Sequence, residues 1–174
     1  MSVPRSTLAT TTLVALAALA ACAEASDPTE PALEAVTAES AAGHHVQGSG
    51  HVETAAGLRE FTFHAVEKPD GSVGGSFKIV LPNGLFFEAE VSCLAVEGDT
   101  GWVGGVIRGT NTALVIVGST SMFWVRDDGE GAGAQDVVSV AGFNRAAGVD
   151  IAFCEDRPLE LAPMNVTGGN VQVR

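Results

Sequence analysis

The chain has 174 residues and a formal net charge of −12, with 9 Lys and Arg residues against 21 Asp and Glu residues. So acidic a chain argues against nucleic acid or anionic lipid as a partner, because binding these polyanions requires a basic patch. The part that follows the N-terminal segments has about 130 residues, which is enough to bury one hydrophobic core.

Residues 1–21 have the features of a secretory signal peptide. Their one charge is Arg5, and residues 8–21 are apolar apart from three threonines. An apolar run of this length suits the hydrophobic region of an export signal, and it is too short to span a bilayer, which takes about 20 apolar residues. We therefore expect this segment to direct export and to be removed.

The apolar run ends in Leu19-Ala20-Ala21-Cys22, which resembles the lipobox of bacterial lipoproteins. The resemblance implies cleavage before Cys22, a diacylglycerol on its sulfur and usually a further acyl chain on its amine; stable anchoring requires more than one chain. We expect lipid anchoring at the bacterial cell envelope, and at the outer membrane of a two-membrane organism because Ala23 rather than Asp follows the cysteine. The alternative is cleavage at the A-x-A match Ala21-Cys22-Ala23, which would release a soluble protein.

Residues 22–43 are predicted to be the lipidated cysteine and a disordered acidic tether. The segment is rich in Ala, Glu, Thr, Ser and Pro, has no aromatic residue, and carries acids with no opposing base. Such a composition buries too little apolar surface to offset the entropy of the chain. As a flexible coil the tether would reach roughly 25 Å. A helix over residues 31–40 is the weaker alternative, because no apolar stripe sustains it.

Residues 44–174 are expected to form a single all-β domain, since apolar and polar residues alternate along much of this region. In residues 85–97, for example, Phe87, Ala89, Val91, Cys93 and Ala95 would share one face. Turn sequences such as Pro-Asp-Gly and Pro-Asn-Gly separate the strands. The predicted strands are residues 45–53, 59–68, 73–81, 85–97, 102–108, 113–117, 121–126, 137–143 and 165–173.

The short loops between these strands predict hairpins, and hence an antiparallel meander of about eight strands. A meander has to bury its apolar face and protect its edges, so we expect it to close as a small barrel or a barrel-like sandwich. The pairs Gly74-Gly75 and Gly104-Gly105 lie inside strand patterns, where glycine permits a sharp bend or a bulge. They favour strongly bent strands over flat sheets.

Cys93 and Cys154 remain once Cys22 is lipidated, and two thiols in an exported domain are predicted to form a disulfide. The bond would close a loop of about 60 residues and contribute about 4 kcal/mol to stability in the chain-entropy treatment. It would hold the irregular stretch after Phe143 onto the core. Two buried free thiols are the alternative.

The acidic residues Asp127, Asp128, Glu130 and Asp136 are the candidate metal site. Clustered carboxylates with flexible glycines can supply the roughly six to eight oxygen ligands that calcium prefers. The competing interpretation is a wide polar turn in which Asp and Gly serve the backbone.

The histidines His44, His45, His51 and His64 suggest a second metal hypothesis, a zinc or copper site. Two of them lie at the junction with the tether, where histidines are usually solvated. Solvated side chains are therefore the competing interpretation.

Aromatic side chains of a small barrel either line a ligand cavity or fill the interior themselves. The residues concerned are Phe61, Phe63, Phe77, Phe86, Phe87, Phe123, Phe143, Trp102 and Trp124. A filled interior is the preferred expectation. A cavity would instead indicate a carrier of a small apolar ligand.

Residues 91–107, VSCLAVEGDTGWVGGVI, resemble a recurrent segment of uncharacterised secreted bacterial β domains. These domains also tend to have an acidic Asp-Gly-Glu loop and an ending like residues 169–173. The resemblance covers about residues 46–174 and implies one β domain, with no established activity.

No nucleophile elbow, paired-carboxylate arrangement or phosphate-binding loop is evident in the sequence, so it proposes no enzyme. We expect a lipid-anchored envelope protein with a non-catalytic β domain for binding or structural support. Its partner would be an unidentified envelope protein or small ligand, and its membrane contact would be the lipid anchor. The alternative is the carrier of a small apolar ligand.

Overall fold

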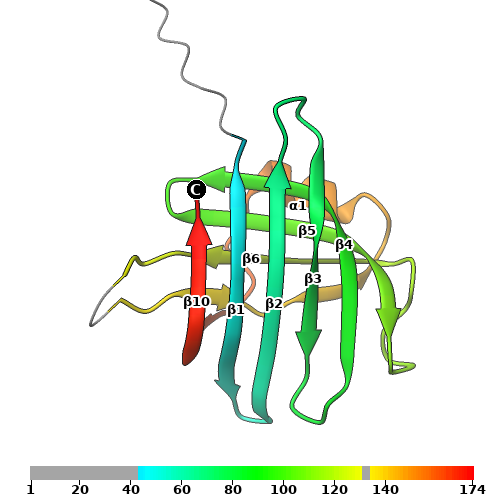
Figure 1. The fold of residues 1–174 in the computed structure, drawn as a ribbon. Helices are drawn as coiled ribbons and strands as arrows, with labels where there is room; N and C mark the ends of the chain where they lie inside the picture. The colour runs from blue at the N-terminus through cyan, green and yellow to red at the C-terminus, as the bar shows by residue number, and fades with distance from the viewer. Residues whose placement is uncertain (1–42, 131–133) are drawn as a thin grey trace, which may run out of the picture. The chain divides into compact units, whose positions relative to one another are not determined.

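The computed structural model describes residues 43–130 and 134–174, and most of these residues lie in β-strands (Figure 1). The strands are β1 (His45–Thr54), β2 (Gly57–Glu67), β3 (Val73–Val80), β4 (Phe86–Glu97), β5 (Thr100–Thr110), β6 (Thr120–Arg126), β7 (Val137–Ser139), β8 (Gly142–Arg145), β9 (Pro163–Asn165) and β10 (Gly168–Val173). The single helix of the described residues is α1 (Val149–Asp156). No helix in these two ranges is long and apolar enough to cross a membrane. The predicted signal peptide, Cys22 and nearly all of the tether lie outside the described residues.

The strands form one antiparallel sheet in the order β10-β1-β2-β3-β4-β5-β6-β7-β9, with β8 paired to β6. Strands β1 to β7 are neighbours in chain order, so the predicted antiparallel meander is confirmed. The sheet curls into a half-barrel (Figure 1). Its two ends are linked by the C-terminal segment, because β9 pairs with β7 and β10, only two residues further on, pairs with β1.

The inside of the curled sheet is filled by side chains from alternate strand positions. Phe61 and Phe63 of β2, Phe77 of β3, Phe87 of β4 and Phe123 of β6 are all buried there. The Phe123 ring lies 5.1 Å from the Phe77 ring and 5.3 Å from the Phe63 ring, between centroids. Aromatic pairs at such distances stabilise a core beyond the burial of their area. The alternation predicted for β2 and β3 is therefore confirmed.

Strand β4 changes the face that it presents to this core at a β-bulge around Ser92. Val91 pairs with Gly105 and Cys93 with Gly104, so Ser92 is the extra residue. The expectation that Val91 and Cys93 share a face is wrong, because a bulge shifts the alternation by one residue. Val91 packs in the inner core, whereas Cys93 packs in a second cluster. The bulge lies in β4, opposite the Gly104-Gly105 pair and not within it. A Cβ at Gly105 would lie 2.5 Å from a carbonyl oxygen of β4.

The second cluster lies between the sheet and α1. Its buried members are Cys93, Trp102, Met122, Trp124, Val137, Phe153 and Cys154. The indole N–H groups of Trp102 and Trp124 donate to the carbonyl oxygens of Pro158 and Leu161, each at 3.0 Å. The stretch after Phe143, expected to be irregular, thus contains a helix followed by a segment tied to the sheet. Strands β5 and β6 are consequently buried on both faces over much of their length.

The predicted Cys93–Cys154 disulfide is present and joins β4 to α1. The two Cα atoms are 6.1 Å apart, within the usual range of about 4.4–6.8 Å. The half-cystines are buried beside Gly104, where a Cβ would lie 2.6 Å from the sulfur of Cys93. Glycine at this position makes room for the bond.

Three predicted strands differ from the structure. Residues 113–117 form turns between β5 and β6 rather than a strand. The apolar run there is explained differently: Val115 is buried in the core, and its neighbours on both sides are exposed. Residues 137–143 are divided between β7 and β8, and residues 165–173 between β9 and β10.

Candidate functional site

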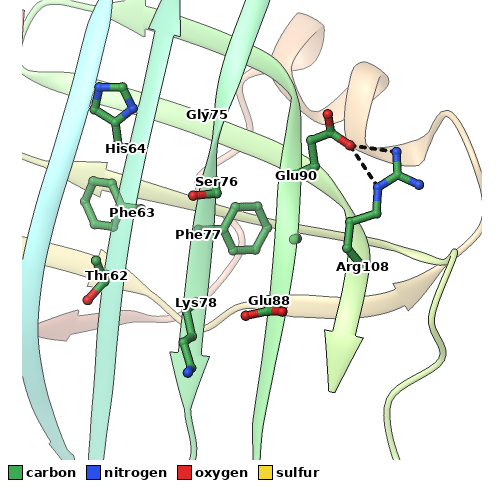
Figure 2. A pocket seen from close by; sticks show the side chains of 11 residues that line it. Thr62, Phe63, His64, Gly75, Ser76, Phe77, Lys78, Glu88, Glu90 and Arg108 are labelled. Carbon is green, nitrogen blue, oxygen red and sulfur yellow. Dashed lines mark hydrogen bonds and ion pairs between the residues drawn. The ribbon is translucent and has the colours of Figure 1, made fainter. Parts of the chain in front are cut away.

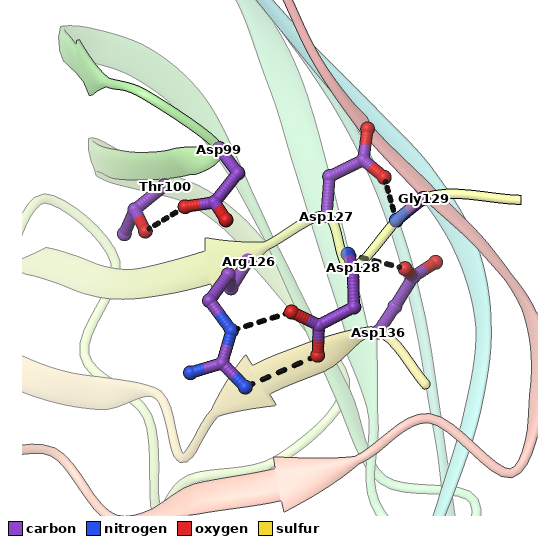
Figure 3. Close-up of polar contacts among 7 residues, drawn as sticks. All are labelled: Asp99, Thr100, Arg126, Asp127, Asp128, Gly129 and Asp136. Atoms are coloured by element: carbon purple, nitrogen blue, oxygen red, sulfur yellow. Dashed lines mark hydrogen bonds and ion pairs between the residues drawn. The ribbon is translucent and has the colours of Figure 1, made fainter. Parts of the chain in front are cut away.

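The acidic loop between β6 and β7 carries the four predicted calcium ligands, of which Figure 3 shows Asp127, Asp128 and Asp136. Asp136, which is buried, accepts the backbone N–H of Asp128 at 3.1 Å and that of Val171 at 2.7 Å. Asp127 accepts the N–H of Gly129 at 2.9 Å and that of Val173 at 3.1 Å. Two carboxylates of the loop are therefore bonded to the backbone of β10, far away in the sequence.

The other two acids have side-chain partners. Arg126 donates to both carboxylate oxygens of Asp128, at 2.8 and 3.1 Å. This forked contact lowers the pKa of Asp128 and raises that of Arg126. Glu130 accepts from the side-chain amide of Asn170 at 3.3 Å.

These contacts give the acidic loop a structural role at the edge of β10. Arg174 and His45 exchange two backbone hydrogen bonds. Because bonded and non-bonded positions alternate along an antiparallel pair, the N–H groups of Val173 and Val171 point away from β1. Asp136 and Asp127 accept these two N–H groups and take the place of a neighbouring strand. An unpaired strand edge is otherwise a liability.

The structure brings the four acids to one loop. Within residues 43–130 and 134–174, no three His, Cys, Asp or Glu side chains are arranged to hold a metal ion. Residues 131–133 of the loop lie outside the described part. Calcium binding by Asp127, Asp128, Glu130 and Asp136 stays a prediction.

The four histidines are only partly brought together. The rings of His45 and His64 lie 5.1 Å apart, edge to face. Burial lowers the pKa of His45, and the neighbouring His64 and Arg174 add to the effect. His44 contacts the carboxylate of Glu67 at 2.7 Å. The zinc or copper hypothesis is likewise untested.

A shallow groove of about 450 Å³ lies over strands β2 to β5 (Figure 2). The polar side chains around it are Thr62, His64, Ser76, Lys78, Glu88, Glu90 and Arg108. Arg108 forms an ion pair with Glu90 at 2.8 Å, and the ammonium of Lys78 lies 4.3 Å from the centre of the Phe86 ring. Hydroxyl, imidazole and charged groups of both signs can bind a polar solute by hydrogen bonds. The sequence did not predict this groove, although the alternation in β2, β3 and β4 predicted that most of its polar residues lie on the face of the sheet opposite the core.

The aromatic residues considered as a cavity lining fall into three places. Five phenylalanines fill the inner core, the two tryptophans pack under α1, and Phe86 and Phe143 lie near the surface. A space beside Phe61 and Ile79 has a volume of about 10 Å³, which is room for at most about one water molecule. The larger grooves, including that in Figure 2, open to the outside.

No protein-family model, curated protein or solved structure matches this chain.

Proposed function

We propose that this chain is a lipid-anchored protein of the bacterial cell envelope, whose β domain binds or supports other envelope components and performs no catalysis. The observation that carries the proposal is the disulfide between Cys93 and Cys154. Disulfides persist in oxidising compartments outside the cytoplasm, so the bond supports the export predicted from residues 1–22. In a two-membrane organism the proposed location is the outer membrane.

The packing of the domain favours binding at its surface over the carriage of an apolar ligand in its interior. The rings of Phe63, Phe77 and Phe123 contact one another inside the sheet. A carrier of an apolar ligand needs an interior volume of roughly 300 Å³ or more, and the rings occupy the place where such a ligand would lie. The polar groove over β2 to β5 is open to a partner from solution. A binding role therefore belongs on the surface of the domain.

Acyl labelling and membrane fractionation in the native host test the anchor. We expect the wild-type chain to take up labelled fatty acid and to sediment with membranes, and Cys22→Ser to do neither. Ala23→Ser is the matched control, because it changes the adjacent residue and keeps the cysteine. If Cys22→Ser sediments with membranes as fully as the wild type, the proposed anchor is wrong.

Native mass spectrometry of the purified mature protein separates the binding and carrier functions. We expect the mass of the acylated chain alone. A further apolar molecule that is retained after delipidating washes and released on unfolding would favour the carrier.

A further inference from the structure

The loop between β5 and β6, residues 111–119, exposes large aliphatic side chains to solvent. Leu114 is 69% exposed, Ile116 is 60% exposed and Val117 is 57% exposed. Val115, in their midst, points the other way and is 5% exposed. Single exposed apolar residues are ordinary, but three at one loop tip form a patch of the kind found at interaction sites.

The loop is held in this exposed arrangement by hydrogen bonds on both sides of its tip. The side chain of Asn144 accepts the N–H of Ile116 at 2.8 Å and donates to the carbonyl oxygen of Leu114 at 2.7 Å. Gly118 donates its N–H to Ile107 at 2.9 Å. With Val115 buried as well, the loop has no freedom to turn its aliphatic side chains inward.

The three segments that meet at this tip contain no acidic residue, and an acid close to them is Glu160, which lines a small groove with Arg145. Asn111 ties the loop to the β3–β4 hairpin through the N–H of Phe86, and Asn144 ties it to β8. The three joined segments, residues 81–87, 109–125 and 137–149, contain one charged residue, Arg145, in a chain with 21 acids. Arg145 and its neighbour Phe143 are both exposed. We call Leu114, Ile116, Val117, Phe143 and Arg145 the apolar tip.

We propose that the apolar tip inserts into the interfacial layer of a phospholipid bilayer. Exposed aliphatic side chains beside an arginine match a layer of acyl chains below anionic phosphates. The overall charge of −12 argued against such a surface, but the three segments that meet at the tip contain no acid, and charges further away are screened beyond about 8 Å. Residues 22–42, outside the described part, span up to about 70 Å when extended, so a chain anchored at Cys22 can turn this end to the membrane. The insertion itself does not depend on the anchor.

Vesicle co-sedimentation of the unlipidated chain tests the proposal. The protein is the whole mature chain, residues 22–174, carrying Cys22→Ser and secreted so that its disulfide forms. The probes are vesicles of phosphatidylcholine, with and without phosphatidylglycerol. We expect binding to both, and Leu114→Asn with Ile116→Asn should weaken it by roughly tenfold or more, because two aliphatic side chains lose their burial. Arg145→Gln should lower the affinity for the vesicles with phosphatidylglycerol roughly fivefold and leave the affinity for the vesicles without it unchanged.

Leu159→Asn is the matched control, since Leu159 is 59% exposed on the segment after α1. It should leave vesicle binding unchanged, and all variants should keep the wild-type melting temperature because the replaced side chains are exposed. Absence of wild-type binding to either vesicle overturns the proposal, as does an equal loss in Leu159→Asn. Concentration-dependent dimerisation that disappears in the double variant, without vesicle binding, would assign the tip to a second copy and also overturn it.

Discussion

Strand β6 is flanked by two loops that differ in what their side chains contact. The loop before it, residues 111–119, directs Leu114 and Ile116 into solvent. The loop after it directs Asp127 and Asp136 to backbone N–H groups of β10. The acidic loop is the more conspicuous in the sequence, yet its polar groups are bonded within the domain. The comparison teaches that a candidate interaction surface is better sought among side chains without partners in the domain than among the most highly charged side chains.

The largest expected effect is that of removing the disulfide, which fastens α1 behind the strands that carry both loops. Cys93→Ala with Cys154→Ala should lower the free energy of unfolding by about 4 kcal/mol, as expected for a bond that closes a loop of about 60 residues. Urea denaturation of the oxidised wild type and the variant measures it. The mature chain with Cys22→Ser is the control and should match the wild type. A loss below about 1 kcal/mol would mean that the packing of the second cluster holds α1 in place without the disulfide.

The next largest effect is the loss of stability expected when the buried Asp136 of the acidic loop is replaced, compared with replacement of the exposed Asp128. Asp136→Ala leaves the N–H groups of Asp128 and Val171 without their acceptor and should reduce stability by about 2–3 kcal/mol. Asp128→Ala removes an exposed ion pair with Arg126 and should cost less than about 1 kcal/mol. Equal losses in the two variants would contradict the structural role of Asp136.

A smaller effect is expected at the fastening of the apolar tip. Asn144→Ala removes two hydrogen bonds to the loop and leaves alanine at a positive φ of 57°, so it should cost about 1–2 kcal/mol. Hydrogen exchange should accelerate in residues 113–118 and remain unchanged in β10. Asn83→Ala, which removes one local turn bond, is the control. Unchanged exchange in the loop would show that the burial of Val115 and the bond from Gly118 to Ile107 hold it without Asn144.

The smallest effect is the response of the acidic loop to pH. Arg126 lowers the pKa of Asp128 in the folded state, so the ion pair contributes fully above the unfolded value of 3.8. This contribution is lost as the pH falls through the folded pKa. Arg126→Gln should therefore lower the melting temperature slightly at neutral pH and leave it equal to the wild type in strong acid. A difference that grows on acidification would contradict the assignment.

Local patterns in the sequence predicted most of the fold. Alternation predicted that Phe61, Phe63 and Phe77 lie inside, and the predicted lipidation of Cys22 left Cys93 and Cys154 as a pair. The bulge at Ser92 could not be predicted, because one inserted residue changes the face without changing the composition.

The parts that the sequence did not predict depend on contacts between distant residues. Residues 113–117 are as apolar as a strand, but turn hydrogen bonds and the contact with Asn144, which is distant in the sequence, hold them as a loop. The bonds of Asp127 and Asp136 to β10 join residues that are 46 and 35 positions apart, which no local pattern encodes. The apolar tip likewise becomes visible only when three separate segments are placed together.

Hydrogen exchange on the acylated, full-length mature protein, with and without phospholipid vesicles, reads both loops in one experiment. Insertion of the apolar tip predicts slower exchange on vesicles in residues 111–119 and 142–147, with no change in residues 127–136. Protection confined to the acidic loop, or no protection in either loop, would contradict a membrane contact through the apolar tip.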